Sequence, residues 1–348
     1  MKRPFAEIQS IACHLPSQTL DNAELVKHFP HWTSEKIVRK LGIETRPIAA
    51  ENETAADLAV AAAEILLDNG SCEHEEIDFV LFCTQSPDYF LPSSACLIHE
   101  RLGLPKACGA LDFNLGCSGY IYGLSLAKGM IETGAAKKVL FITSETYSKY
   151  INADDRSSRP LFGDGAAATL VSVAAKGTKE DPIGPFVFGT DGSGADLLIV
   201  PAGGHRLPAS AETAIEQPDG KGSVRSLSQL RMHGPGIFSF AVDRVPPMVE
   251  ELLQKSGKTR EEIGCYVFHQ ANKYMLDRLQ ELCNLRGTNF FNDVMHRGNT
   301  VSCSIPVAMA DAWQCGMLKP GDWVMLVGFG VGLSWGATLV KLPSHFTV

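Results

Sequence analysis

The amino-acid sequence predicts an α/β protein made of two similar halves. The chain has 348 residues, which is more than a single hydrophobic core usually contains. Two segments repeat one pattern, a polar connection followed by a buried strand: EEIDFVLFCTQ from Glu75 and EEIGCYVFHQA from Glu261. Helical segments alternate with such strands along the chain, and this alternation is typical of parallel or mixed sheets.

The predicted elements of the two halves follow one another in the same order. The stretch MKRPFAEIQSIACHLP is predicted as the first strand, because its polar residues interrupt the apolar run that a signal peptide needs. LDFNLG then ends a strand, and YIYGLSLAKGMIETG has helical spacing. The distance along the chain from Cys117 to the helix-ending Gly134 equals that from Asn299 to Gly316. The strands that follow also match, AAKKVLFITSE with LKPGDWVMLVGFG and GDGAAATLVSV with GLSWGATLVKL.

We therefore expect residues 1–175 to form one half, which carries Cys117, and residues 176–348 to form the other. The boundary is predicted within residues 174–181, AAKGTKED, which are polar and include a glycine. Residues 203–229 form a longer polar excursion that we interpret as a surface insertion in the second half. Such a segment is either a lid or partner surface, or a disordered spacer.

Composition argues against several functions. The formal net charge is −8 and long basic runs are absent from the sequence, which argues against a nucleic-acid-binding surface. The 10 cysteines show no C-x-x-C spacing, so the sequence predicts neither a metal site nor a disulfide scaffold. Apolar stretches stay short of the roughly 20 residues that span a bilayer. We therefore expect a cytoplasmic protein without membrane insertion.

Three residues are candidates for chemistry. Cys117 lies where a strand gives way to a helix, and a helix N-terminus favours the nucleophilic thiolate. His269 follows the strand GCYVF at its C-terminal end, the edge where α/β proteins place ligand sites. Asn299 lies in a glycine-flanked loop, ahead of a helix that we expect to begin near Cys303.

Each candidate has an ordinary structural explanation when it is taken alone: a buried thiol, a core histidine and a turn asparagine. The duplication changes this interpretation, because it brings the three residues to the facing ends of two similar sheets. We therefore predict acyl transfer, with Cys117 as the nucleophile that carries a thioester. His269 and Asn299 would donate hydrogen bonds to a developing enolate oxygen.

Five motifs resemble the β-ketoacyl-acyl-carrier-protein synthase III family of thiolase-fold condensing enzymes. They are GCSG around Cys117, HQAN from His269, GNT from Gly298, GDGAAA from Gly163 and GFGVGLSWG from Gly328. The resemblance covers essentially the whole chain. It implies a thiolase-like fold with a five-layer αβαβα core, a homodimer and ping-pong chemistry without a cofactor.

The resemblance also implies the substrates. An acyl primer would move from acyl-CoA to Cys117. A malonyl thioester, on acyl carrier protein or coenzyme A, would then lose CO₂ with help from His269 and Asn299. The resulting carbanion would attack the acyl-cysteine and give a β-ketoacyl thioester.

Further substrate-binding residues follow from the same resemblance. The residue that matches the family's gate beside the Cys and His is Phe329, and Gly330 stands in the glycine loop where degradative thiolases need a second cysteine. Phe90 or Leu91 lies where the family closes the acyl pocket with a residue of the partner subunit. The positions that contact the coenzyme A arm in the family match Asn272 and Arg156.

The chain departs from the family at several positions. Lys36 stands where the family has a tryptophan that stacks on adenine, and Lys40 aligns with a basic residue after it. The excursion at 203–229 is longer than in housekeeping synthases, and FSFAV after Pro235 could reshape the acyl pocket. These departures favour a specialised member with an unusual primer.

Two alternatives stay open at this point. An acyltransferase could move the acyl group from Cys117 to an alcohol or amine without forming a carbon–carbon bond. A non-catalytic subunit could merely dimerise with an active synthase, although such a subunit has no chemical need for all three candidate residues. The sequence leaves the primer's length and branching undetermined.

Overall fold

The computed structural model describes residues 3–29 and 31–348 and contains two five-stranded sheets. The first has the strand order β1–β7–β6–β4–β5, with bounds Ala6–His14, Gly165–Val173, Lys138–Glu145, Phe79–Cys83 and Gly109–Phe113. The second has the order β14–β13–β15–β16–β8, with bounds Phe290–Phe291, Cys265–Phe268, Trp323–Gly330, Ser334–Lys341 and Ile183–Thr190.

The two sheets have one topology. Strand β4 and strand β13, which follow the two EEI segments, are each parallel to both of their neighbours. The next two strands of each sheet, β7 and β1 or β16 and β8, continue it in antiparallel fashion. The duplicated α/β architecture predicted from the repeats is therefore confirmed. The first sheet draws its strands from residues 6–173 and the second from residues 183–341, so residues 174–181 connect them.

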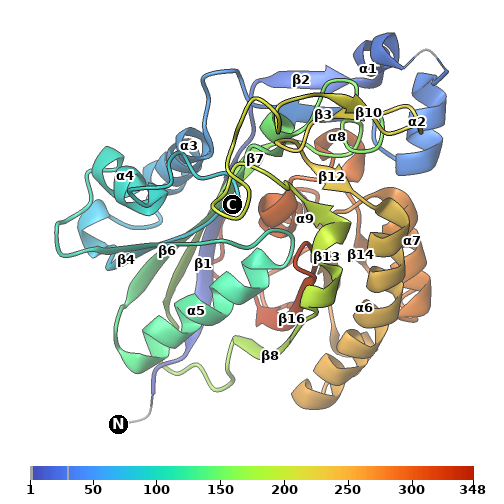
Figure 1. The fold of residues 1–348 in the computed structure, drawn as a ribbon. Helices are drawn as coiled ribbons and strands as arrows, with labels where there is room; N and C mark the ends of the chain where they lie inside the picture. The colour runs from blue at the N-terminus through green and yellow to red at the C-terminus, as the bar shows by residue number, and fades with distance from the viewer. Residues whose placement is uncertain (1–2, 30) are drawn as a thin grey trace.

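Helices form three layers around the sheets (Figure 1). The outer face of the first sheet is covered by α3 (Ala55–Asp68) and α4 (Ser94–Arg101). Between the sheets lie α5 (Gly119–Thr133) and α9 (Ser304–Gln314), and the second sheet is covered by α6 (Gly234–Ser256), against which α7 (Lys273–Leu282) packs. This order of layers is the αβαβα core that the resemblance implied.

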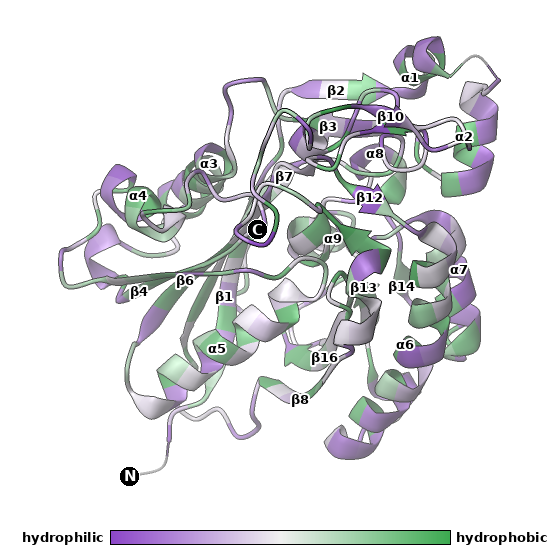
Figure 2. Cartoon of the chain, in the orientation of Figure 1, coloured by the Kyte–Doolittle hydropathy of each residue, from purple (hydrophilic) through white to green (hydrophobic). Residues whose placement is uncertain are grey.

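Helix α5 is central because it packs against both sheets. Its glycines permit this close approach: a Cβ built on Gly123 would lie 2.1 Å from the ring of Phe141. Gly134, in the left-handed conformation with φ 78°, ends the helix as predicted. Figure 2 shows hydrophobic residues along the strands and the facing sides of the helices, and hydrophilic residues on the outer turns of α6 and α7.

Smaller elements surround the core. They are β2 (Gln18–Asp21), α1 (Asn22–His28), α2 (Ser34–Leu41), β3 (Thr45–Ile48), β9 (Leu198–Ile199), β10 (Gln217–Pro218), β11 (Val224–Arg225), β12 (Arg231–Met232) and α8 (Val294–Arg297). Short 3₁₀ segments lie at His74–Glu76, Tyr147–Tyr150, Gly192–Leu197, Arg260–Glu262 and Val301–Cys303.

The insertion at 203–229 contains the β10–β11 hairpin, which packs on a loop of the first half. The Arg225 guanidinium pairs with Asp155 at 2.9 Å, and the Val224 amide donates to the Asp154 carbonyl at 3.4 Å. The segment is thus a packed surface hairpin rather than a structureless spacer. Across the described residues, none of the helices combines the length and apolar character needed to cross a membrane.

Candidate active site

One cavity of about 70 Å³ is lined by all three predicted catalytic residues, Cys117, His269 and Asn299. Its lining also contains three of the predicted substrate-binding residues, Phe329, Gly330 and Asn272. The remaining walls are mostly apolar and come from both halves: Leu161, Phe162, Leu198, Met232, Gly234, Ile237, Ala271 and Met275. The fold therefore brings together side chains that lie far apart in the sequence.

Cys117 lies in the turn between β5 and α5 and is only 4% exposed. Two glycines of β15 let that strand pass directly against it. A Cβ on Gly330 would lie 2.6 Å from the Cys117 Sγ, and one on Gly328 would lie 2.8 Å from the Cys117 carbonyl oxygen. Close packing thus explains the glycines of this motif, because a side chain at Gly328 or Gly330 would collide with the turn that carries Cys117.

Burial controls the protonation of Cys117. Loss of hydration raises the pKa of its thiol to about 12, and this effect outweighs the hydrogen bond from the Val331 backbone, which lowers it. The resting thiolate expected from the helix terminus is therefore wrong. The helix N-terminus does favour the thiolate, but the free-energy cost of placing an ion in a dry cavity is larger. With this raised pKa the Cys117 side chain is a neutral thiol at physiological pH.

His269 follows β13, and its backbone amide donates to the Val327 carbonyl oxygen of β15 at 2.7 Å. Its Nδ1 lies 2.7 Å from the Ser304 Oγ, and both residues are 2% exposed. Burial lowers the pKa of His269 to about 3, so the imidazole is neutral at physiological pH. A neutral ring can donate one hydrogen bond while carrying no charge.

Asn299 is held in place by both its backbone and its side chain. The backbone amide donates to the Leu161 carbonyl oxygen at 2.9 Å, which fastens the loop to the first half. Its Oδ1 accepts from the Val301 amide at 2.9 Å. Because only the oxygen of the side-chain amide can accept, this bond fixes the rotation of the group and leaves its NH₂ free to donate. Val301 adopts a φ of 57°, a strained conformation for a β-branched residue.

Phe329 and Asn272 line the same cavity as the catalytic candidates. The rings of Phe329 and His269 meet edge to face, with centroids 5.5 Å apart and planes at 82°. Asn272 caps α7, where its Oδ1 accepts from the Met275 amide at 2.9 Å. Its NH₂ therefore also stays available to a ligand in the cavity.

The other three predicted substrate-binding residues lie outside this cavity's lining in the described part of the chain. Phe90 and Leu91 are 81% and 86% exposed. Arg156 packs against the insertion, where a Cβ on Gly222 would lie 2.6 Å from its guanidinium. The hairpin thus borders the residue that the resemblance assigns to the coenzyme A arm.

Near Lys36, which stands where the family has a tryptophan, the structure has another tryptophan, Trp32. The ammonium groups of Lys36 and Lys40 lie 5.4 Å and 5.3 Å from the ring centroid of Trp32, which precedes the first residue of α2, Ser34. An aromatic ring is therefore present near this position, but two cations accompany it.

Sequence reasoning missed a buried polar network behind the cavity. Glu145 ends β6 and is fully buried, where it accepts from the Gln85 amide at 3.0 Å, the Ser86 hydroxyl at 3.1 Å and the Ser302 hydroxyl at 2.8 Å. Burial raises the pKa of this carboxyl to about 8. The available signal was the polar pair SE at the end of the strand segment VLFITSE, whose first four residues are apolar. The bond to Ser302 joins the first half to the loop that carries Asn299.

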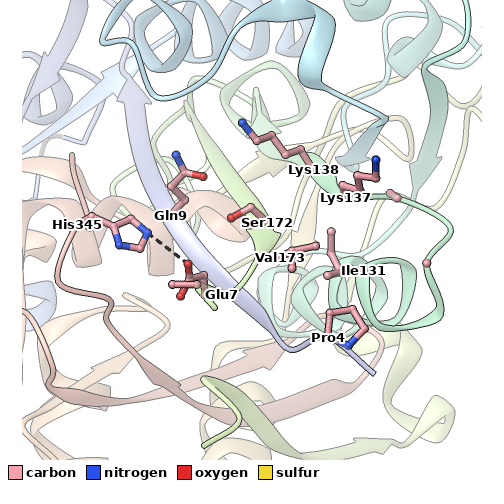
Figure 3. A pocket seen from close by; sticks show the side chains of 12 residues that line it. Pro4, Glu7, Gln9, Ile131, Lys137, Lys138, Ser172, Val173 and His345 are labelled. Carbon is pink, nitrogen blue, oxygen red and sulfur yellow. Dashed lines mark ion pairs between the residues drawn. The ribbon is translucent and has the colours of Figure 1, made fainter. Parts of the chain in front are cut away.

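A wider hollow of about 700 Å³ lies at the C-terminal end of α5, whereas Cys117 precedes the N-terminal end of this helix. Figure 3 shows side chains that line the hollow. It is lined by Ile131 and Gly134, near the end of α5, and contains the ion pair between Glu7 and His345 at 3.3 Å. The length of a 15-residue helix, roughly 22 Å, separates it from the nucleophile. Groups of three or more His, Cys, Asp or Glu able to hold a metal are absent from the described residues.

A duplicated five-layer core with a cysteine at the start of its central helix places this chain among thiolase-fold acyltransferases. Two family profiles match it. "3-Oxoacyl-[acyl-carrier-protein (ACP)] synthase III" matches residues 111–192, and the C-terminal profile of the same synthase matches residues 253–342.

Curated relatives and solved structures agree with these matches. The β-ketoacyl-[acyl-carrier-protein] synthase III of Natranaerobius thermophilus is 36% identical over 97% of this chain and 99% of its own length. That of Clostridioides difficile is 37% identical over 97% and 98%. A crystal structure of a 3-oxoacyl-(acyl-carrier-protein) synthase III superposes with a TM-score of 0.95 at 50% identity, covering 97% of this chain and 100% of the other. The structure from Burkholderia xenovorans gives 0.90 at 32%, with 100% and 98% covered.

The chain belongs to the β-ketoacyl-acyl-carrier-protein synthase III family, as its motifs indicated. It is a condensing enzyme, and its reaction class is that of an acyltransferase. The comparisons favour this reading over simple acyl transfer to an alcohol or amine. The priming β-ketosynthase of the R1128 polyketide pathway shares the fold with a TM-score of 0.85 at 30% identity, over 98% of this chain and 97% of the other.

Proposed function

We propose that Cys117 takes an acyl primer from acyl-CoA and that His269 and Asn299 assist decarboxylative condensation with a malonyl thioester. The observation that carries this proposal is their placement on one cavity, with the Asn299 NH₂ left free by the bond from Val301 to its oxygen. A nucleophile beside two neutral hydrogen-bond donors suits a reaction in which negative charge develops on a thioester oxygen.

In the first step the Cys117 sulfur attacks the thioester carbonyl, and the bond to the sulfur of coenzyme A breaks. The thiol proton leaves with the coenzyme A thiolate, so the acyl-enzyme and free coenzyme A form without a net change of charge. This balance suits a site in which burial raises the pKa of the thiol. The apolar walls favour a hydrocarbon primer.

In the second step the bond between the malonyl α-carbon and the carboxylate breaks, and CO₂ leaves. The electron pair of that bond stays on the α-carbon and forms a thioenolate. The N–H groups of His269 and Asn299 hold the thioenolate oxygen. Its carbon attacks the acyl group, the β-ketoacyl thioester forms, and Cys117 leaves as a thiolate that takes up a proton from solvent. The raised pKa of Cys117 drives this last protonation.

The proposal extends to partners. Arg156 and Asn272 would contact the coenzyme A arm, and the exposed Phe90 or Leu91 of one subunit would close the acyl pocket of the other in a homodimer. The extender would be carried by acyl carrier protein or coenzyme A. We place this reaction in the cytoplasm and in fatty-acid-type synthesis, with coenzyme A thioesters as substrates and no cofactor.

The test is intact-mass analysis of the protein after incubation with short, long, branched and aromatic acyl-CoA donors. We expect one acyl adduct, mapped by peptide analysis to Cys117 and absent from Cys117→Ala. The exposed thiols Cys96 and Cys315 serve as internal controls for non-specific acylation. An adduct on those thiols instead, or none with the whole panel, contradicts the proposal.

A second measurement separates condensation from plain acyl transfer. CO₂ release from a malonyl thioester is expected only if a carbon–carbon bond forms. His269→Ala should still acylate Cys117 but release CO₂ slowly, because it lacks one donor to the thioenolate oxygen. An unchanged rate of CO₂ release in this variant refutes the role of His269. Activity of the purified wild-type protein alone excludes a non-catalytic subunit.

A further inference from the structure

We propose that the hydroxyl group of Ser304 is a positioning group that holds His269 in the tautomer whose Nε2 carries the proton. The proposal rests on the role given above to His269 and goes beyond it, since it names the group that makes a neutral histidine a donor.

The two side chains meet away from the substrate cavity. Ser304 is the first residue of α9, and its Oγ lies 2.7 Å from the Nδ1 of His269. The serine lines a separate pocket of about 10 Å³ behind the histidine, whereas His269 itself lines the cavity with Cys117. Since Nδ1 faces Ser304, the other ring nitrogen, Nε2, faces the cavity.

A neutral imidazole has one N–H, so its two nitrogens cannot both donate. Burial keeps His269 neutral at physiological pH. If Nε2 is to donate to a thioenolate oxygen, Nδ1 must accept a hydrogen bond from its own neighbour. The hydrogen bond made by Nδ1, on the side of the ring away from the substrate cavity, therefore decides the tautomer.

The neighbours of the ring differ in what they can do. The backbone carbonyl of Val301 also interacts with His269, and a carbonyl can only accept, so it favours a proton on the nitrogen that faces it. The Ser304 hydroxyl can donate. Its oxygen already accepts from the Gln270 backbone amide at 3.4 Å, which leaves the hydroxyl proton free to point at Nδ1. Ser304 thus supplies the donor that Nδ1 needs.

The experiment compares Ser304→Ala with Ser304→Thr in the full-length protein. ¹⁵N-histidine NMR reports which ring nitrogen carries the proton, and loss of one set of signals in His269→Gln assigns them. We expect Nε2–H in the wild type and in Ser304→Thr, and a shift toward Nδ1–H in Ser304→Ala. Ser302→Ala is the matched control: it removes a buried hydroxyl from the same turn that bonds to Glu145 rather than to His269, and it should leave the His269 signals unchanged.

Kinetics give the second readout. Ser304→Ala should acylate Cys117 at the wild-type rate but release CO₂ from the malonyl thioester about 100-fold more slowly, the usual loss for one oxyanion donor. Ser304→Thr should recover most of that rate. If Ser304→Ala does not fold, the wild-type tautomer decides the question.

The inference is overturned by a wild-type His269 protonated at Nδ1, or by a Ser304→Ala variant with unchanged tautomer and CO₂ release. These results differ from a failure of the proposed function. If His269→Ala keeps full CO₂ release, the function of His269 is wrong. If His269→Ala loses it and Ser304→Ala does not, only the role of Ser304 is wrong.

Discussion

Replacing the buried carboxyl of Glu145 with an amide should change how the protein's stability depends on pH. Burial raises the pKa of this group from 4.5 to about 8 in the folded protein. Between these values the folded state keeps the proton and the unfolded state releases it. The contribution of Glu145 to the free energy of unfolding is therefore fully present below pH 4.5 and is lost as pH rises toward 8.

The size of the effect follows from the shift. Each pH unit between the two pKa values lowers the free energy of unfolding by about 1.4 kcal/mol, so the loss at pH 7 is about 3 kcal/mol. Glu145→Gln removes the titration while keeping the shape of the side chain. Its oxygen can still accept from the Gln85 amide, and the hydroxyls of Ser86 and Ser302 can rotate to suit its NH₂. The variant should gain stability over the wild type as pH rises.

The assay is urea unfolding of both proteins at pH 5, 6, 7 and 8, at one protein concentration. Because the other titrating groups are common to both proteins, the difference between the two curves isolates Glu145. Parallel curves across this range would refute the claim that the folded protein holds the carboxyl in its neutral form. Glu145→Ala is the contrasting variant. It should unfold more easily at every pH, because it leaves three buried donors without an acceptor.

Three further predictions concern the site and its surroundings. Gly330→Ala should slow acylation of Cys117 by about tenfold or more in single-turnover mass measurements, because its Cβ would lie 2.6 Å from the sulfur. Gly129→Ala is the control, because a Cβ added at this helical position would lie more than 4 Å from other described parts of the chain beyond its own turn of helix; it should raise the melting temperature without slowing acylation. The rate of CO₂ release should show no inflection from His269 between pH 5 and 8, since its pKa of about 3 keeps it neutral there; an inflection that disappears in His269→Gln would contradict this. Phe90→Ala and Leu91→Ala should change stability by less than about 0.5 kcal/mol, because both side chains are exposed, yet shift the preferred primer length if they close the partner's pocket; unchanged preference in both variants counts against that role.

The sequence predicted the features that depend on repeated patterns. The two EEI segments and the strands after them gave the common topology of the sheets, and the spacing to Gly134 and Gly316 placed Cys117 and Asn299 at equivalent positions. That equivalence predicted that the two residues lie close together, and both line one cavity. Repetition carries this information because equivalent elements occupy equivalent places in the two halves.

Features that depend on global burial could not be predicted in this way. The partner of Glu145, Ser302, lies 157 residues away in the chain, and no local pattern relates the two. The prediction of a Cys117 thiolate was wrong for the same reason. A helix N-terminus is visible in the sequence, but the loss of water around a side chain is a property of the whole fold.

The site handles charged intermediates without standing charges of its own. Both Cys117 and His269 are held neutral by burial, and Asn299 is neutral by nature. In the proposed reaction, charge would appear only when substrate supplies it, as the malonyl carboxylate, the thioenolate or the leaving thiolate, and the two N–H donors would meet that charge without reorganising. A histidine that became positive would add an ion to a dry cavity and would bind the malonyl carboxylate in the ground state, which favours retention of CO₂ rather than its loss. Burial lowers the pKa of His269 to about 3, and the proposed chemistry needs the neutral ring that this low pKa provides.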